Sequence, residues 1–279
     1  MHTIELPAGP LKYRTWGPRS STAHPVVFLH PVLTDGRLWT NVGELLAARG
    51  VRSYAPDWPL GAHVAPLHPD ADRSPEGVAQ MVRDFLDRLD LTDVCLVGND
   101  TGGALTQFVI TGGEPRVSSA LLINCDAFTT FPPFPLNAIL AALRVERLAV
   151  LVATAMRWTP LRHSWLGYGL LSRHLDPTLT RDWLRPARTD PAVRRDLIAF
   201  LHAVDPERLD DATHRLADVD IPIEVLWGMA DRCFRPALGR RLARAVGTDL
   251  REVPGARTLL ALDAPEEVAE AITALRPVV

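Results

Sequence analysis

The ten residues LVGNDTGGAL, Leu96–Leu105, decide how the rest of the chain is interpreted. An apolar, strand-like run reaches the sequence Gly-Asn-Asp-Thr-Gly and passes at once into a helical pattern. The residue at the apex of so tight a strand–helix turn is forced into a strained backbone region, and its neighbours two positions away must be small. Gly98 and Gly102 meet this requirement. The stretch therefore predicts a sharp turn that exposes the Asp100 side chain beyond the end of a strand.

Asp100 has a second possible role as the N-cap of the helix, where its carboxylate would accept a backbone N–H. An N-cap does not require a glycine on each side of it. The pattern of flanking glycines therefore favours the sharp turn. The first N–H groups of the helix would then point towards the carboxylate. We interpret G-x-D-x-G as a nucleophile elbow in which aspartate takes the place of serine.

The composition is that of a globular protein. Of its 279 residues, 47% are hydrophobic and 23% are charged, with a net charge of −3. This predicts one large α/β domain, or a core with an insertion, and no nucleic-acid partner. Because no apolar run suits a signal peptide or a membrane span, we expect a cytoplasmic protein with no membrane partner. The three cysteines lack CxxC spacing, so we expect neither disulfides nor a metal site.

Short apolar and β-branched runs alternate with helical patterns along most of the chain. The expected strands are Leu11–Trp16, Val26–His30, Ser53–Asp57, Asp93–Gly98, Ser119–Cys125, Ile223–Gly228 and Asp249–Pro254. The expected helices are Leu38–Arg49, Ser74–Leu89, Thr101–Thr111, Pro236–Val246 and Pro265–Leu275. This alternation predicts an α/β fold with a mostly parallel central sheet flanked by helices.

One long segment interrupts the alternation. Residues 127–219 contain no strong strand pattern, open with the proline- and phenylalanine-rich sequence FTTFPPFP, and continue as helical patterns. We expect a helical cap at 127–219, inserted into a core formed by 1–126 and 220–279.

The chain as a whole resembles the α/β-hydrolase family, in particular the branch of epoxide hydrolases and haloalkane dehalogenases, whose nucleophile is aspartate. The resemblance rests on the elbow and on four further stretches: FLHPVLTDGRLW, APDWPLGAH, VLWGMADRCF and VPGARTLLALDAPEEVAEAI. It implies an α/β-hydrolase fold with a cap, and a cofactor-independent enzyme.

The resemblance also implies roles for individual residues. The family's oxyanion segment begins His-Gly, whereas this chain has His30 followed by proline; the donors would be the N–H groups of Val32 and Thr101. Asp231 matches the position of the family's acid. Asp126 matches an acid position that some members use after the preceding core strand.

The catalytic histidine of the family is missing. The sequence DAPEEVAEAI aligns without gaps and places Thr258 where histidine is expected, and no histidine follows His214. In the hydrolytic cycle aspartate forms an alkyl ester, and histidine deprotonates the water that cleaves it. Threonine cannot act as that base.

Three interpretations remain open. Another histidine could serve as base, with His30 and His63 best placed because both follow core strands. Asp100 could instead act as a general base or charge stabiliser in a cyclisation, elimination or carbon–carbon bond formation. The protein could also be a ligand-binding relative without catalysis.

For several activities of the family, this chain lacks a residue that the activity uses. Haloalkane dehalogenases place tryptophan after the nucleophile, where this chain has Thr101, and epoxide hydrolases use two cap tyrosines, of which only Tyr168 is present. We therefore expect a non-hydrolytic, cofactor-independent reaction on a small hydrophobic secondary metabolite, catalysed by a monomer or homodimer. The expected site residues are Asp100, Asp231, His30, Val32, Thr101, His63, Asp126, Phe128, Trp158, Tyr168 and Thr258, with Phe131 and Phe134 as further cap aromatics.

Overall fold

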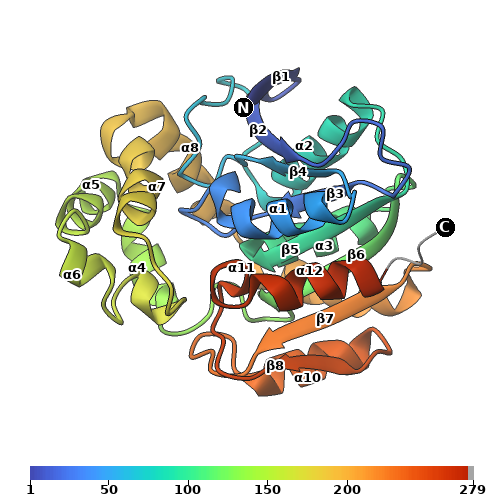
Figure 1. Cartoon of the computed structure of the whole chain (residues 1–279). Coiled ribbons are helices and arrows are strands. Elements are labelled where there is room, and N and C mark those ends of the chain that lie inside the picture. Colours follow the sequence, from blue (N-terminus) through green and yellow to red (C-terminus); the bar gives the residue numbers. More distant parts are fainter. Residues whose placement is uncertain (276–279) are drawn as a thin grey trace.

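The computed structural model describes residues 1–275 and contains a central sheet with the strand order β1-β2-β4-β3-β5-β6-β7-β8 (Figure 1). The strands are β1 (His2–Leu6), β2 (Gly9–Trp16), β3 (Val26–Leu29), β4 (Ser53–Pro56), β5 (Val94–Asp100), β6 (Val117–Cys125), β7 (Ile223–Gly228) and β8 (Leu250–Val253). Strands β3 to β8 pair in parallel, and β1 and β2 form an antiparallel edge. The prediction of a mostly parallel sheet is confirmed.

Helices cover both faces of this sheet. The core helices are α1 (Thr40–Ala48), α2 (Pro75–Arg88), α3 (Thr101–Thr111), α10 (Pro236–Ala245), α11 (Leu260–Asp263) and α12 (Pro265–Ala274), with the short 3-10 helix η1 (Gly36–Trp39). On one face α1 contacts α12, and on the other α3 contacts α2. Because both faces are covered, all seven residues of β5 are buried, as expected for a central parallel strand.

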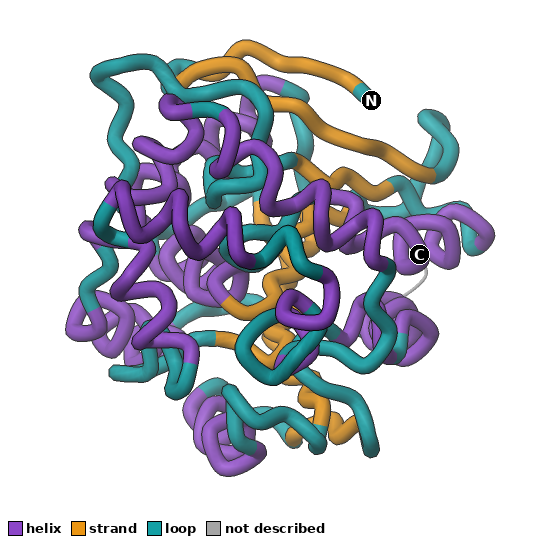
Figure 2. Tube along the Cα trace, turned by 90° about the vertical axis from the view of Figure 1, so that its left-hand side faces the viewer, coloured by secondary structure: helices purple, strands orange, loops and turns teal. Residues whose placement is uncertain are grey.

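The segment 127–219 holds the remaining helices. They are α4 (Leu136–Leu143), α5 (Glu146–Ala155), α6 (Thr159–Arg162), α7 (Pro177–Thr189), α8 (Pro191–Ala203) and α9 (Pro206–Arg215), with the 3-10 helices η2 (Tyr168–Leu170) and η3 (Leu216–Asp218). Helices α4 to α7 stand beside one end of the sheet in Figure 1, and in Figure 2 this side faces the viewer. Helix α9 instead contacts α3 of the core. The division into core and cap at 127 and 219 stays a proposal.

Two elements were not expected from the sequence. Strand β1 has mostly exposed residues and therefore lacks the apolar signal of a core strand. Helix α11 has four residues, which is too short to show helical periodicity. None of the helices within residues 1–275 is long and apolar enough to cross a membrane.

The topology brings several strand ends together. Strand β3 lies between β4 and β5, so the strand order reverses at β3. In open α/β sheets, ligands bind at the carboxyl ends of strands next to such a reversal. Strand β5 ends there with Asp100, and its parallel neighbours β6 and β7 end at the same edge.

The glycines around Asp100 permit a close approach of strand and helix. A Cβ atom on Gly102 would lie 2.1 Å from the carbonyl oxygen of Leu29, and one on Gly98 would lie 2.4 Å from the carbonyl oxygen of Gly102. Both contacts involve backbone atoms, which cannot move away as the end of a flexible side chain could. The elbow therefore depends on glycine at both positions.

We predict that Gly102→Ala destabilises the protein by roughly 2–4 kcal/mol, because the added methyl group overpacks a backbone contact. Gly113→Ala is the control, because Gly113 has φ +76 and open space around it. Alanine there meets only conformational strain, which should lower the free energy of unfolding by about 1 kcal/mol. Urea unfolding measures both free energies. Equal losses in the two variants would contradict the close packing at the elbow.

Candidate active site

Asp100 is the last residue of β5 and the residue before α3. Its backbone has φ 55° and ψ −124°, a conformation that non-glycine residues rarely adopt. The side chain is 7% exposed and lines a cavity between the sheet and the helices of residues 127–219. The predicted sharp turn is therefore present, and it points a carboxyl group into the interior.

The carboxyl group of Asp100 is only partly satisfied. Its Oδ1 accepts hydrogen bonds from the backbone N–H of Thr101 at 2.6 Å and from the Thr101 hydroxyl at 3.0 Å. Burial raises the pKa of Asp100 to about 7, the two Thr101 hydrogen bonds oppose this rise, and the charge of Asp231 adds to it. Near neutral pH, Asp100 can therefore both hold and release a proton.

Asp231 lies in the turn after β7 and is 6% exposed. Its Oδ1 accepts the N–H groups of Cys233 at 2.7 Å and Phe234 at 3.1 Å, and its Oδ2 accepts the Asn124 side-chain amide at 2.7 Å. Burial raises the pKa of Asp231 to about 6, although these hydrogen bonds lower it in part. The carboxyl group is thus fixed in orientation beside the site.

Thr258 is fully buried in the loop after β8. Its hydroxyl is close enough to Asp231 to lower the pKa of that carboxyl, but within residues 1–275 it makes no hydrogen bond. Its carbonyl oxygen accepts the Asn99 side-chain amide at 2.9 Å. The structure thus brings Thr258 next to Asp231.

Asp126 follows β6 and is 1% exposed. Neither of its carboxyl oxygens has a hydrogen-bond partner among the described residues. Burial, together with the charge of Asp100, raises the pKa of Asp126 well above its usual range. An unpaired carboxylate at this depth would be very costly, so we interpret Asp126 as the neutral acid.

His30 was predicted as a possible base, but both of its ring nitrogens are occupied. Nε2 accepts the backbone N–H of Trp58 at 2.9 Å, so Nδ1 carries the proton and donates to the carbonyl oxygen of Pro31 at 2.9 Å. Complete burial lowers the pKa of His30 to about 4. His30 therefore joins the ends of two strands as a neutral ring, and no nitrogen is free to accept a proton.

His63 is also engaged away from Asp100. Its Nδ1 accepts the N–H of Gly61 at 3.2 Å, and its Nε2 lies 3.3 Å from the Asp196 carboxylate. Asp196 is itself bound by Arg73 at 2.7 Å. His63 thus belongs to a buried ion network that connects the loop after β4 to α8.

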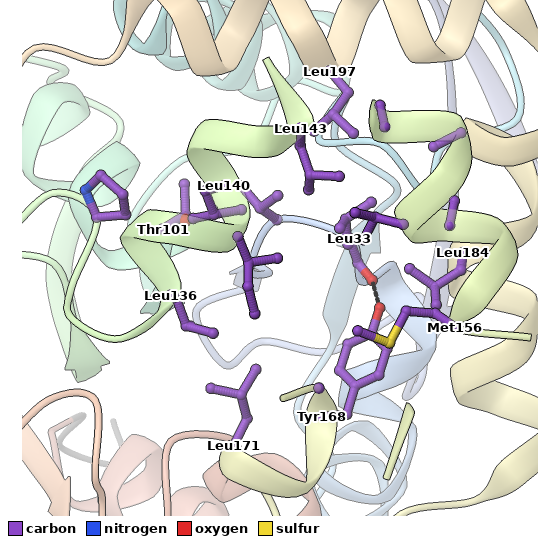
Figure 3. Close-up of a pocket in the computed structure, with 18 of the residues that line it drawn as sticks. Leu33, Thr101, Leu136, Leu140, Leu143, Met156, Tyr168, Leu171, Leu184 and Leu197 are labelled. Atoms are coloured by element: carbon purple, nitrogen blue, oxygen red, sulfur yellow. Dashed lines mark hydrogen bonds between the residues drawn. The ribbon is translucent and has the colours of Figure 1, made fainter. Parts of the chain in front are cut away.

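The cavity beside Asp100 has a mostly aliphatic lining (Figure 3), to which Arg194 adds one cationic side chain. Its apolar residues are Val32, Leu33, Pro132, Pro133, Leu136, Ile139, Leu140, Leu143, Ala149, Val152, Ala153, Met156, Leu166, Leu171, Leu184, Ala187 and Leu197. Tyr168 also lines it, and its hydroxyl donates to the carbonyl oxygen of Leu33. Such a lining suits a hydrophobic small molecule.

The expected aromatic lining is not what the structure shows. The Phe128 ring is buried elsewhere, with the guanidinium of Arg241 3.6 Å from its centre. Trp158 and Phe134 are 66% and 74% exposed, and Phe131 is buried outside the cavity wall. The reason is that α4 and α5 present leucine and alanine side chains to the cavity, while their aromatic neighbours lie on connecting segments.

Two backbone donors were predicted to bind a substrate oxygen. Val32 does line the cavity next to Asp100. The N–H of Thr101, however, points back to Oδ1 of Asp100. It can reach a substrate oxygen only if that hydrogen bond breaks.

The sequence reasoning missed two buried amides. Asn124, with φ 27°, accepts the N–H of Gly228 at 2.6 Å and donates to Asp231, so it joins β6 to the acid loop. Asn99 donates to the carbonyl oxygens of Ile123 and Thr258. Each is a polar residue at the end of an apolar strand, and that position was the available signal.

Within residues 1–275, no cluster of three or more histidine, cysteine or acidic residues could hold a metal ion.

The chain belongs to the alpha/beta hydrolase family, whose family model matches residues 26–271. The chain is 28% identical over 229 residues to a 2-hydroxy-6-oxononadienedioate/2-hydroxy-6-oxononatrienedioate hydrolase of Paraburkholderia xenovorans, covering 79% of this chain and 75% of that protein. It is 25% identical over 265 residues to haloalkane dehalogenase 2 of Mycobacterium bovis, covering 90% and 87%. The crystal structure of the ancestral haloalkane dehalogenase AncHLD2 has the same fold, with a TM-score of 0.78 and 20% identity over 98% and 97% of the two chains.

We predict a pH dependence of stability that comes from Asp100. Its pKa rises from 3.8 to about 7 on folding, so between these values the folded protein binds a proton that the unfolded chain has released. The free energy of unfolding therefore falls as pH rises through this window, by roughly 2–4 kcal/mol.

Asp100→Asn removes this titration while its side-chain oxygen can still accept the Thr101 N–H. Urea unfolding at pH 4.5, 6 and 8 should show a smaller fall for the variant than for the wild type. Two contributions stay in both proteins: that of Asp231, whose pKa is about 6, and that of Asp126, whose pKa burial also raises. Identical profiles would show that the pKa of Asp100 is not raised.

Proposed function

We propose that this protein is a cofactor-independent enzyme that uses Asp100 to move a proton on a hydrophobic small molecule, in a cyclisation, elimination or carbon–carbon bond formation without hydrolysis. The observation that carries the proposal is the Asp100 carboxyl group, which faces an aliphatic cavity and has threonine in place of the expected base.

The raised pKa of Asp100 supports acid–base chemistry. A general base works best when its pKa lies near the working pH, and burial brings the pKa of Asp100 to about 7. The same desolvation favours removal of a proton from carbon, because no water shields the carboxylate from the substrate. In this proposal Asp100 accepts the proton, the aliphatic wall holds the substrate, and Thr101 orients the carboxyl group.

Hydrolysis through an alkyl ester would need a base for the attacking water. Thr258 cannot be that base, and the ring nitrogens of His30 and His63 are already engaged. An ester on Asp100 would therefore persist. General-base loss costs on the order of 10²–10⁴-fold in rate.

The names of the relatives favour a second candidate, a hydrolase or dehalogenase with a relocated base. A hydrolase incorporates oxygen from labelled water into its product, whereas a cyclase or lyase does not. A ligand-binding relative without catalysis is a third candidate, and it would convert no probe. The two experiments below distinguish all three.

We predict that the protein accelerates the Kemp elimination of 5-nitrobenzisoxazole, in which a base removes the C–H proton as the N–O bond breaks to give a cyanophenolate. The rate, followed by phenolate absorbance, should rise with pH with a midpoint near 7, because only ionised Asp100 accepts the proton.

Asp100→Asn should lower this rate by on the order of 10²-fold or more. Asp210→Asn is the control: Asp210 lies on α9 at the surface and does not line the cavity. A rate that is the same in wild type and Asp100→Asn would overturn the proposal.

We predict that Thr258→His creates hydrolytic activity that the wild type lacks. The new imidazole would stand beside Asp231, in position to deprotonate water. With 1,2-epoxyhexane in oxygen-18 water, the variant should release labelled diol, and the wild type should release none and show at most an ester adduct by intact-mass spectrometry.

Thr258→Val is the matched control, because it changes the same buried site without adding a base. Circular dichroism verifies that both variants fold. Labelled diol from the wild-type protein would contradict the non-hydrolytic proposal and favour the relocated base.

A further inference from the structure

Four arginines converge on a second pocket, next to the cavity of Asp100. We call it the arginine pocket. It is lined by Arg157, Arg181, Arg185, Arg188, Asp182, Ala153, Met156 and Leu184. No motif in the sequence marked it, because Arg157 follows α5 and the other three arginines lie on α7.

The spacing on α7 explains the convergence. Arg181, Arg185 and Arg188 stand at positions i, i+4 and i+7, which share one face of a helix. Like charges at this spacing repel one another and destabilise a helix by a few tenths of a kcal/mol per pair. A helix that keeps three of them together therefore suits a negatively charged ligand.

Three of the four arginines have no carboxylate partner within residues 1–275. Asp182 is the one acidic residue that lines the pocket, and it already contacts Arg37 at 3.4 Å and Arg181 at 3.8 Å. Among the described residues, the guanidinium groups of Arg157, Arg185 and Arg188 make no ion pair or hydrogen bond. The pocket thus carries an excess of positive charge with free donors.

The arginine pocket shares a wall with the cavity. Ala153, Met156 and Leu184 line both spaces. Figure 3 shows Met156 and Leu184 next to each other on the side of the cavity where the Tyr168 ring lies. An alkyl chain that joins the two spaces needs this wall to move, and methionine, which is unbranched, is the most adaptable of its three side chains.

We infer that the arginine pocket binds a phosphate-type anionic group carried by the same molecule whose apolar part occupies the cavity. Arginine donates in pairs to phosphate oxygens, and the donors of several guanidiniums exceed what one carboxylate can accept. The substrate is then an anionic amphiphile, with its phosphate group at α7 and its reacting carbon near Asp100. This inference rests on the proposed function only for the assignment of the cavity as the substrate site.

Isothermal titration calorimetry with octyl phosphate, 1-octanol and inorganic phosphate tests the inference. Octyl phosphate should bind at least tenfold more tightly than 1-octanol, which lacks the anion, and than inorganic phosphate, which lacks the chain. Its advantage over 1-octanol should shrink as salt is raised, because Arg157, Arg181 and Arg185 are exposed to solvent. Equal affinities for octyl phosphate and inorganic phosphate would indicate a free-anion site and overturn the inference.

The double variant Arg157→Gln/Arg185→Gln should lose most of the advantage of octyl phosphate and leave 1-octanol binding unchanged. The control is Arg88→Gln/Arg244→Gln, two exposed arginines on α2 and α10 that lie outside both pockets. An equal loss in the control would show general charge attraction and would also overturn the inference.

The Asp100→Asn variant separates this inference from the proposed function. Its loss of Kemp elimination tests the role of Asp100, whereas the loss of octyl phosphate affinity in Arg157→Gln/Arg185→Gln tests the arginine pocket. If Kemp elimination fails while octyl phosphate binding depends on Arg157 and Arg185, the proposed chemistry is wrong and the anion site stands. If the elimination succeeds but octyl phosphate binding does not depend on Arg157 and Arg185, the anion site is wrong and the proposed chemistry stands.

Discussion

The backbone at Asp100 depends on close packing that only glycine permits. With φ 55° the residue is strained, and the contact between Gly102 and the carbonyl of Leu29 holds strand and helix close enough to keep it so. Because of this constraint a carboxyl group emerges at the carboxyl end of the sheet and under the helices of residues 127–219. The burial of that carboxyl group, and hence its raised pKa, follows from the turn.

No cation is among the groups within residues 1–275 that shift the pKa values of the buried carboxyl groups around the elbow. Asp100, Asp126 and Asp231 are all buried, and the pKa of each is raised, first of all by burial. An imidazolium at position 258 would favour the ionised forms of these carboxyl groups, but Thr258 supplies only a hydroxyl group. Without a cation beside it, the Asp100 carboxyl group is more easily protonated.

The sequence was sufficient for the elbow, because glycine spacing and a strand–helix junction are local features. That Thr258 takes the place of a histidine stays a prediction. The sequence could not show that the ring nitrogens of His30 and His63 already contact other groups. Their partners are the N–H groups of Trp58 and Gly61, the carbonyl of Pro31 and the carboxylate of Asp196, and chain topology rather than local sequence brings the distant ones close. The aliphatic character of the cavity was likewise hidden, because composition does not reveal which helix face turns inward.

The separation of the two pockets has an electrostatic consequence. A guanidinium beside Asp100 would stabilise the carboxylate and lower its pKa, which would weaken it as a base at neutral pH. The groups that shift the pKa of Asp100 are its burial, Thr101 and Asp231, and no arginine is among them. The aliphatic wall at Met156 and Leu184 thus lies between the cavity and the four arginines of the arginine pocket. Arg194 does line the cavity, but its guanidinium donates to the carbonyl oxygens of Ala187 and Arg188. A ligand anchored by its anionic end at α7 can place its apolar end at Asp100. Binding then uses positive charge at α7, whereas proton transfer needs its absence at Asp100, and the two needs are met in separate places.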